Sequence, residues 1–460
     1  MIKRISWMIL GVLLASTAFA RDEYVRTFDK TLTLQPGQRV FVEHKFGDVI
    51  VRTHPQAEIV IHAVIHVSAA DANQAKSYAD RVEILVEPSS SEISIRTRYP
   101  DTSRGGFFNY RSCSYSMRYE ITMPETAPLE VRNSFGGISV TGVKGGAQLT
   151  NSHGNVESRN GAGTEHLENA FGSVRVEGNA GDVSIENTNG SIDASDIKGM
   201  LNVRDRFASI NTAHIGKGVT IANNNGSVEV NDCGGPASVR NSFGSVSVHN
   251  IQGDLTVNNG NGSIEAAHVS GAAELNTTFS HVAFADIGRQ VSVHTNNSKV
   301  EGERAGGPVT VRNSFGEVHI NEVGGLLSVR NQNGSVEAAH AKGAQIATSF
   351  ASVIIQGIDG PIQIENQNGA VEASSAAQGR CQPVIVHTSF APIRVRLPGD
   401  ASYAVFAKTS FAKIHTDFPL LVSGSDGVSG GEISGKIGSG ACELRLTNNN
   451  GPIEIMKSGP

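Results

Sequence analysis

The chain contains few of the residues that build dense disulfide frameworks or broad aromatic cores. Its 460 residues include four cysteines, one tryptophan and six methionines. The cysteines are too scattered for the framework of a small secreted domain. Cys233 falls on a position that is otherwise aliphatic, which predicts a buried thiol. A Cys381–Cys442 bridge would tie the C-terminal region together, and the sequence leaves the pairing of Cys113, Cys381 and Cys442 open.

Motifs of catalysis and metal binding are also missing. The sequence has no Gly-Gly-x-Gly-x-Asp calcium repeat, no Gly-x-Ser-x-Gly elbow and no phosphate-binding loop. Its 15 histidines form no compact repeated ligand set. His62 and His66 share the face of one predicted strand, but no neighbouring carboxylate or cysteine completes a zinc site. We therefore expect no catalytic residue, no metal and no cofactor.

A concentrated basic face is absent too, since 38 basic residues stand against 44 acidic ones. This balance argues against nucleic acid as a partner. Long apolar runs are limited to the N-terminus, where Lys3 and Arg4 precede an apolar stretch and Ala18-Phe19-Ala20 supplies small residues for cleavage. We expect residues 1–20 to be a signal peptide, and the mature protein to be exported without a transmembrane segment.

Glycine, in contrast, is abundant, with 51 residues, and it accompanies a strict repeat. Phenylalanine recurs at a spacing of 36 residues, and an asparagine or His153 lies halfway between successive phenylalanines. A period of 18 residues that is doubled in this way is typical of stacked coils. The predicted corner ladder consists of Phe135, Phe171, Phe207, Phe243, Phe279 and Phe315, alternating with Asn189, Asn225, Asn261, Asn297 and Asn333.

Each unit reads Gly-Ser-Val-x-Val-x-x-Val-x-Gly-x-Leu-x-Val-x-Asn-x-(Phe or Asn). Two short runs of alternating apolar residues separated by glycine predict two short strands per unit, each with one face inward. Successive coils then pair in parallel, because the chain always travels around the same circuit. The predicted fold is all-β, a single-stranded parallel β-helix of about 18 residues per coil with a 36-residue double repeat.

We expect four regions along the chain. Residues 1–20 are the signal peptide, 21–130 hold a first coil with an inserted α/β capping region, 131–411 form the regular β-helix, and 412–460 form irregular C-terminal coils and a cap. Within the cap, strands are expected at 58–67, 82–86, 92–98 and 118–124, and a short helix at 69–81. The unit Gly154 to Phe171 departs from the pattern, because Glu165 replaces an inward aliphatic residue and Gly161 replaces a valine.

This pattern of Asn-x-x-Gly-x-Val-x-Val coils behind a strand-rich start resembles the bacterial putative-adhesin family of β-solenoids. The resemblance covers about Val40 to Ile455. It implies an exported, β-helical, non-catalytic protein of the envelope. The family has no established functional residue that could be assigned to a position in this sequence.

Two charged columns are candidate binding surfaces. Arginines at a second outward position, Arg132, Arg204, Arg240 and Arg312, are expected to neutralise charge between coils, with carbohydrate recognition as the alternative. Acidic residues recur at the fourth position of alternate units, which the flanking inward residues turn toward solvent. The acidic column could bind cations or a basic partner, or it could be a solvated face that discourages aggregation; it comprises Glu157, Asp193, Glu229, Glu265, Glu301, Glu337 and Glu372.

The function that we expect is that of a structural or binding rod, an adhesin, in the periplasm or on the cell surface, with a surface glycan or an envelope protein as its partner. One alternative is a carbohydrate-active β-helix enzyme, a polysaccharide lyase or hydrolase, with a cleft shaped by residues 423–440. Another is assembly of the protein through the ends of the coil stack.

Overall fold

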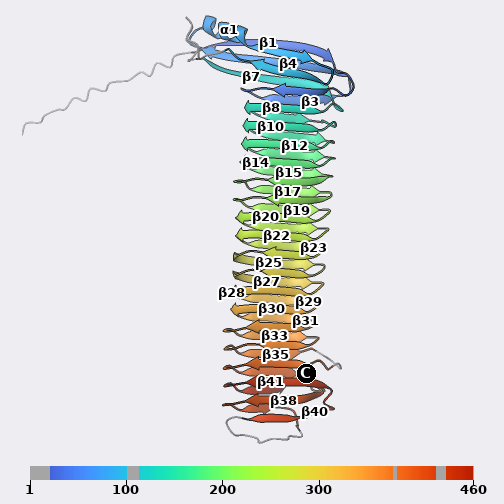
Figure 1. Ribbon diagram of the computed structural model, residues 1–460, viewed down its shortest axis with the longest axis vertical. Helices are drawn as coiled ribbons and strands as arrows, with labels where there is room; N and C mark the ends of the chain where they lie inside the picture. The colour runs from blue at the N-terminus through green and yellow to red at the C-terminus, as the bar shows by residue number, and fades with distance from the viewer. Residues whose placement is uncertain (1–20, 101–112, 377–380, 421–430, 459–460) are drawn as a thin grey trace, which may run out of the picture.

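The computed structural model describes residues 21–100, 113–376, 381–420 and 431–458. The predicted signal peptide lies outside these ranges, as does part of the glycine- and serine-rich stretch 423–440. The described chain forms one long stack of coils with a broader cap at its N-terminal end (Figure 1).

The coil formed by residues 244–261 shows the arrangement that the other regular coils repeat. Strand β21 (Val246–Ile251) buries Val246 and Val248, and β22 (Leu255–Asn261) buries Leu255 and Val257, so the aliphatic side chains of both strands meet inside the coil. At the corner before β21, Gly244 has a φ of 118°, a backbone conformation that glycine adopts without steric cost. The prediction of an all-β solenoid with coils of about 18 residues is confirmed.

The coils stack into two parallel sheets. Sheet I, in spatial order, contains β2 (Arg39–Glu43), β8 (Leu129–Phe135), β10 (Ala147–His153), β12 (Glu165–Phe171), β14 (Val183–Asn189), β16 (Met200–Arg204), β18 (Gly218–Ala222), β20 (Ala237–Phe243), β22, β24 (Ala273–Asn276), β26 (Val291–His294), β28 (Val309–Phe315), β30 (Leu327–Asn333), β32 (Ala344–Thr348), β34 (Ile362–Glu365), β36 (Val384–Thr388), β41 (Cys442–Asn448) and β38 (Tyr403–Thr409). Sheet II contains β3 (Val49–His54), β9 (Ile138–Thr141), β11 (Val156–Gly161), β13 (Val174–Asn179), β15 (Ile192–Ile197), β17 (Ile210–Ile215), β19 (Val228–Cys233), β21, β23 (Ile264–Val269), β25 (Phe279–Ile287), β27 (Asn297–Ala305), β29 (Val318–Val323), β31 (Val336–Ala341), β33 (Val353–Ile358), β35 (Val371–Ser375), β37 (Ile393–Leu397), β42 (Ile453–Lys457) and β39 (Ile414–Thr416).

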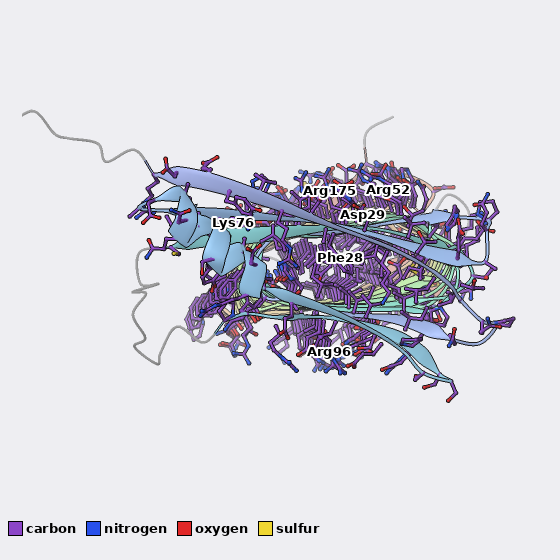
Figure 2. The ribbon with its side chains drawn as sticks, turned by 90° about the horizontal axis from the view of Figure 1, so that it is seen from above. Phe28, Asp29, Arg52, Lys76, Arg96 and Arg175 are labelled. Carbon is purple, nitrogen blue, oxygen red and sulfur yellow. A yellow bond between two sulfur atoms is a disulfide. The ribbon has the colours of Figure 1, made fainter. Side chains whose placement is uncertain are left out.

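The view along the stack shows a flattened section with the core between the two sheets (Figure 2). Arg175 of β13 lies on one broad outer face, and Arg96 of the cap lies on the opposite one. Side chains of neighbouring coils therefore line up in columns, and each column belongs to one face or one corner of the rod.

The cap extends both sheets beyond the first coil, which is formed by β2 and β3. Sheet II continues through β7 (Ser114–Pro124) and β4 (Glu58–Ala69) to the edge strand β1 (Asp22–Thr33), while β6 (Glu92–Arg98) and β5 (Glu83–Pro88) extend sheet I. Helix α1 (Ala72–Arg81) begins after the N-cap Asp71 and packs on β1 and β4. The sequence analysis did not foresee β1, whose charged side chains protect an otherwise open sheet edge.

The C-terminal coils do not follow the order of the chain. Strand β41 pairs with β36 on one side and β38 on the other, and β42 likewise lies between β37 and β39. The last coil of the sequence is therefore inserted between the two coils that precede it in the chain. Strand β40 (Glu432–Ile437) closes the edge as an antiparallel partner of β38. The expectation that every coil pairs with its neighbour in sequence is wrong at this end.

A disulfide fastens this inserted coil. Cys381, just before β36, is bonded to Cys442 at the start of β41, with a Cα–Cα distance of 5.7 Å. Cys233 is a buried free thiol and Cys113 is free and partly buried. The structure thus selects one of the pairings that the sequence left open.

We expect loss of this bond to loosen the C-terminal coils selectively. The bond spans 61 positions of the sequence, and in the chain-entropy account a loop of that length corresponds to roughly 4 kcal/mol. A variant carrying Cys381→Ser and Cys442→Ser should lose amide hydrogen-exchange protection in β36 to β42 first. The control is Cys113→Ser, which should retain the protection of the parent chain; equal protection in all three proteins would contradict the prediction.

Candidate functional site

The acidic column lies on the outer face of sheet II, as its alternation predicts. It is not a continuous line of negative charge, because other residues occupy the coils between. Arg175 lies in register between Glu157 and Asp193, and His319 lies between Glu301 and Glu337. Most of the predicted acids also have a nitrogen of an arginine, lysine or histidine side chain within 4 Å; these are Glu157, Asp193, Glu301, Glu337 and Glu372.

The column borders a groove of about 640 Å³ on sheet II. Its floor is low because Ala267, Ala283, Ala285 and Ala339 occupy outward positions there. Beneath it, the ring of Phe284 is buried in the core, and the space for that ring exists because the next coil carries Gly302. A side chain at that glycine would overlap the ring, which makes Phe284 and Gly302 a matched pair.

Two carboxylates, Glu301 and Glu303, project into this groove from one strand. Alternate residues of a strand are roughly 6.6 Å apart, a separation that paired carboxylates of glycosidases also span. The ammonium of Lys299, at 2.5 Å, lowers the pKa of Glu301, and Arg304 lies 2.7 Å from Glu303. The lowered pKa of Glu301 is the opposite of what a general acid requires, and Glu303 forms an ion pair with Arg304.

The outer face of sheet I carries a second groove of about 660 Å³. Arg312 of β28 and Arg330 of β30 lie in register on adjacent strands within it. Polar side chains and one exposed ring complete the lining, among them Gln332, Gln367, Ser389 and Phe390. Like charges on directly opposed residues of neighbouring strands are unfavourable, and among the described residues neither guanidinium forms an ion pair.

The predicted arginine column is thus of mixed character. Arg132 lies 2.7 Å from Glu130, and Arg204 lies 3.2 Å from Glu186, so these two neutralise charge within and between coils. Arg312 instead faces another arginine. Arg132 and Arg204 therefore have the neutralising contacts that were expected, whereas Arg240 lies in register with Asn258 and, among the described residues, neither Arg240 nor Arg312 forms an ion pair.

The predicted corner ladder lies where sheet I turns into sheet II. Phenylalanine and asparagine alternate in register, as in the pairs Phe171 with Asn189 and Phe315 with Asn333. The phenylalanines are exposed despite their size, from 43% at Phe135 to 57% at Phe207 among the six predicted ones. The corner is therefore part of the surface of the rod.

A different asparagine column, two residues earlier, supplies most of the side-chain hydrogen bonds to the corner carbonyls. Asn151 Nδ2 donates to the carbonyls of Gly136 and Gly154, at 3.0 and 3.1 Å, and so joins the corners of two successive coils. The side-chain amides of this column are buried. The repeated motif Asn-x-(Phe or Asn) is the sequence signal that could have identified them. The column includes Asn133, Asn151, Asn169, Asn187, Asn241, Asn259, Asn313, Asn331 and Asn366.

The opposite corner has a polar column that sequence reasoning also missed. Its residues adopt a left-handed backbone, with φ between 52° and 59°, which asparagine, aspartate and histidine tolerate better than most residues. Their side chains contact one another between coils, as Asn250 donates to Asp232 at 2.9 Å and Arg304 donates to Asp286 at 2.6 Å. The column consists of Asn160, Asp196, His214, Asp232, Asn250, His268, Asp286, Arg304, Glu322 and His340.

Two carboxyl groups lie inside the rod. Glu165 is 1% exposed and accepts a hydrogen bond of 2.9 Å from Ser158 Oγ, and burial raises its pKa to about 7. Gly161 leaves the room that this carboxyl group occupies, which explains both departures from the repeat in that unit. Asp205 occupies a position of the buried column at which other coils carry asparagine, and burial raises the pKa of its carboxyl group to about 6.

Within the described ranges, histidine, cysteine, aspartate and glutamate form no group of three that could hold a metal ion. The described part of the chain also has no helix that is long and apolar enough to cross a membrane. The two grooves and the exposed corner are candidate surfaces for binding.

The fold and these surfaces define the class, a parallel β-solenoid with a capped N-terminal end. The chain matches no model of a known protein family. No curated protein matches it either.

The solved structures similar to this chain include three bacterial proteins. A putative cell adhesion protein from Clostridium sporogenes is 7% identical, with a TM-score of 0.15, covering 94% of this chain and 100% of that one. A putative adhesin from Bacteroides fragilis is 8% identical, with a TM-score of 0.19, covering 68% and 97%. A putative lipid binding protein from Parabacteroides distasonis is 12% identical, with a TM-score of 0.17, covering 74% and 96%. The strand pairing of this chain shows the parallel β-solenoid that the sequence resemblance implied, and no residue role is transferred from these structures.

The buried carboxyl groups predict a dependence of stability on pH. Each has a folded-state pKa above its ordinary value, 4.5 for Glu165 and 3.8 for Asp205, so the folded chain binds the proton more tightly than the unfolded chain. Stability should fall as pH rises from about 4 to 7, and the full penalty, on the order of 3 kcal/mol for each group, should be present at pH 8. Thermal unfolding midpoints at pH 5 and pH 8 measure this difference.

Glu165→Gln and Asp205→Asn should raise the midpoint at pH 8 and flatten its pH dependence, because neither amide ionises. Asp205→Asn also restores the donor that the asparagine column uses at the corners. The matched control, Asp193→Asn on the outer face, should leave the pH dependence as it is. A parent chain that is equally stable at both pH values would contradict the prediction.

Proposed function

We propose that this protein is an exported, non-catalytic β-solenoid that serves as an adhesin at the bacterial envelope and binds an anionic surface polysaccharide on sheet I. The rod presents flat faces on which side chains are held in fixed columns, and such faces suit an extended repetitive ligand better than a small molecule. The adhesin names of two similar structures agree with a binding role for those proteins.

The observation that carries the proposal is the pair Arg312 and Arg330. Two guanidinium groups on adjacent strands repel each other, and a ligand carboxylate or sulfate would relieve that repulsion by forming paired hydrogen bonds. The surrounding amides of Gln332 and Gln367 and the hydroxyl of Ser389 are donors and acceptors that sugar hydroxyls use. A uronic-acid-containing polysaccharide combines both chemistries.

Binding of the purified full chain to immobilised polysaccharides tests the ligand. A uronic-acid polymer should bind better than its neutral counterpart. The variant Arg312→Ala with Arg330→Ala should weaken binding about a hundredfold or more, since each of the two lost charged contacts contributes roughly 1.5–3 kcal/mol in a favourable geometry. The control removes two arginines from the opposite face, Arg159→Ala with Arg175→Ala, and should retain the affinity. Equal loss in both variants would contradict a site on sheet I.

The same incubations test the absence of catalysis. If the chain were a lyase or hydrolase, new reducing ends or unsaturated sugars would accumulate, and Glu301→Gln or Glu303→Gln would abolish them. We expect no product, because both carboxylates of the sheet II groove are paired with cations.

Export is tested by the mass of the chain recovered from an expressing bacterium. The envelope or secreted fraction should contain a protein that begins at Arg21, since Ala18-Phe19-Ala20 matches a cleavage site. Recovery of the uncleaved chain from the cytoplasm alone would contradict export.

A further inference from the structure

The exposed phenylalanines form one apolar edge along the whole rod. Their exposed fractions run from 43% to 73%, far above those of the core side chains. Large apolar residues gathered on one edge mark an interaction surface more often than scattered ones do. The edge comprises Phe135, Phe171, Phe207, Phe243, Phe279, Phe315, Phe350, Phe390 and Phe411.

Phenylalanine and asparagine alternate along this edge even at the C-terminal end, where the coils do not stack in the order of the sequence. In the C-terminal coils, Thr388, Asn448 and Thr409 lie in register on β36, β41 and β38. Two residues further on, the same register places Asn450 between Phe390 and Phe411, although Asn450 follows both in the sequence. The inserted coil therefore supplies the asparagine that the alternation requires.

The spacing of the rings leaves slots between them. Neighbouring strands are about 4.8 Å apart, so rings on every second coil are roughly 9.6 Å apart. At one position the slot is filled by a flat ring of the chain itself: the His153 ring lies 4.7 Å from the Phe135 ring and 5.0 Å from the Phe171 ring, with interplanar angles of 15° and 14°. Elsewhere the shorter asparagine side chain leaves the outer part of the slot open.

The surroundings of the edge carry little charge. The positions that flank the ring column are mostly serine, threonine, asparagine, glutamine and glycine, as in Ser242 and Ser245 beside Phe243. Charged exceptions include Arg206, Lys299 and Glu317. Although the chain has a net charge of −6, two copies can approach along this edge without a row of like charges facing each other.

We propose that a second copy of this chain covers the edge, with the phenylalanines of each rod inserted into the slots of the other. A two-fold axis parallel to the rods would set ring against ring at the same height. An axis perpendicular to the rods lets the rings interleave, and gives an antiparallel, closed dimer. Each inserted ring then lies about 4.8 Å from its two neighbours, the arrangement that His153 already has.

The available area fits such a dimer. A phenylalanine buries about 150–250 Å² when fully covered, and roughly half of each ring in this edge is exposed. Nine rings therefore offer on the order of 900 Å² per copy, close to the roughly 800 Å² per partner of a stable interface.

The orientation of the measured rings disfavours a polysaccharide on the same edge. The rings of Phe46 and Phe135 are nearly parallel, with an interplanar angle of 10°, and both Phe135 and Phe171 are stacked on His153. Their faces point along the rod and their edges point outward. A sugar lying along the rod would meet ring edges, whereas stacking on sugars requires the faces.

Sedimentation velocity of the purified full chain over about 1–100 µM tests the proposal, with a dimer as the expected species. The variant Phe243→Asn, Phe279→Asn, Phe315→Asn should be monomeric over this range. Asparagine already occupies the same corner in alternate coils, so the fold should be retained, which circular dichroism checks. The matched control, Met200→Asn with Leu326→Asn, removes exposed apolar side chains away from the ring edge and should remain dimeric.

A photo-cross-linking residue at Phe171 tests the antiparallel arrangement. Cross-links should join it to corner residues of the C-terminal coils in the second chain. A parent chain that is monomeric at 100 µM, a triple variant that remains dimeric, or cross-links between equivalent positions would each overturn the proposal. The polysaccharide assay with the arginine variants is scored separately, so failure of one idea does not decide the other.

Discussion

The backbone hydrogen bonding between successive coils is the constraint on which the rest of the structure depends. Each strand has no partner within its own coil, so its N–H and C=O groups are satisfied only by the coils on either side. This pairing holds only if every coil returns to the same register, and the chain does so every 18 residues over most of the stack, as in Val228, Val246 and Ile264. Once the register is fixed, each position of the repeat becomes a column.

Columns explain how the rod tolerates unusual residues. Each inward side chain packs against the side chains at the same repeat position in the coils above and below. A larger or more polar residue at such a position therefore fits only where a nearby residue is small. Gly302 supplies it for Phe284, and Gly161 supplies it for Glu165. The buried asparagine amides join consecutive corners, and Asp205 interrupts them with a carboxyl group that burial disfavours in its charged form.

The outer columns give the rod distinct surfaces. On sheet II, Arg175 and His319 interrupt the acidic column, and Asn211, Ser247 and Ala283 occupy other coils between the acids, so the negative charge is diluted rather than continuous. On sheet I, Arg312 and Arg330 remain opposed, and the adjoining corner carries exposed rings. The proposed polysaccharide groove and the proposed dimer edge lie mostly on different sides of the rod, and they meet at Phe390, which belongs to both.

The sequence by itself determined the coil, because the 18-residue period, the glycine corners and the paired apolar runs each require only local conformation and parallel stacking. It also determined which strand residues point outward, including the acidic column, because alternation along a strand fixes its faces. The corner phenylalanines lie two residues after an inward asparagine, so alternation alone would turn them inward, and only the structure shows that they are exposed. The arginine column could be placed on a face in the same way, but not sorted into neutralised and opposed members.

Tertiary structure alone decided three things. The edge strand β1 lacked a clear repeat signal, since an edge strand has only one covered neighbour and a half-exposed pattern. The insertion of β41 and β42 between earlier coils, and with it the Cys381–Cys442 bond, depends on contacts between segments about 60 residues apart that no local pattern records. The match of Gly161 to Glu165 likewise appears only when the two sheets face each other, because the residues that share the core space belong to opposite strands.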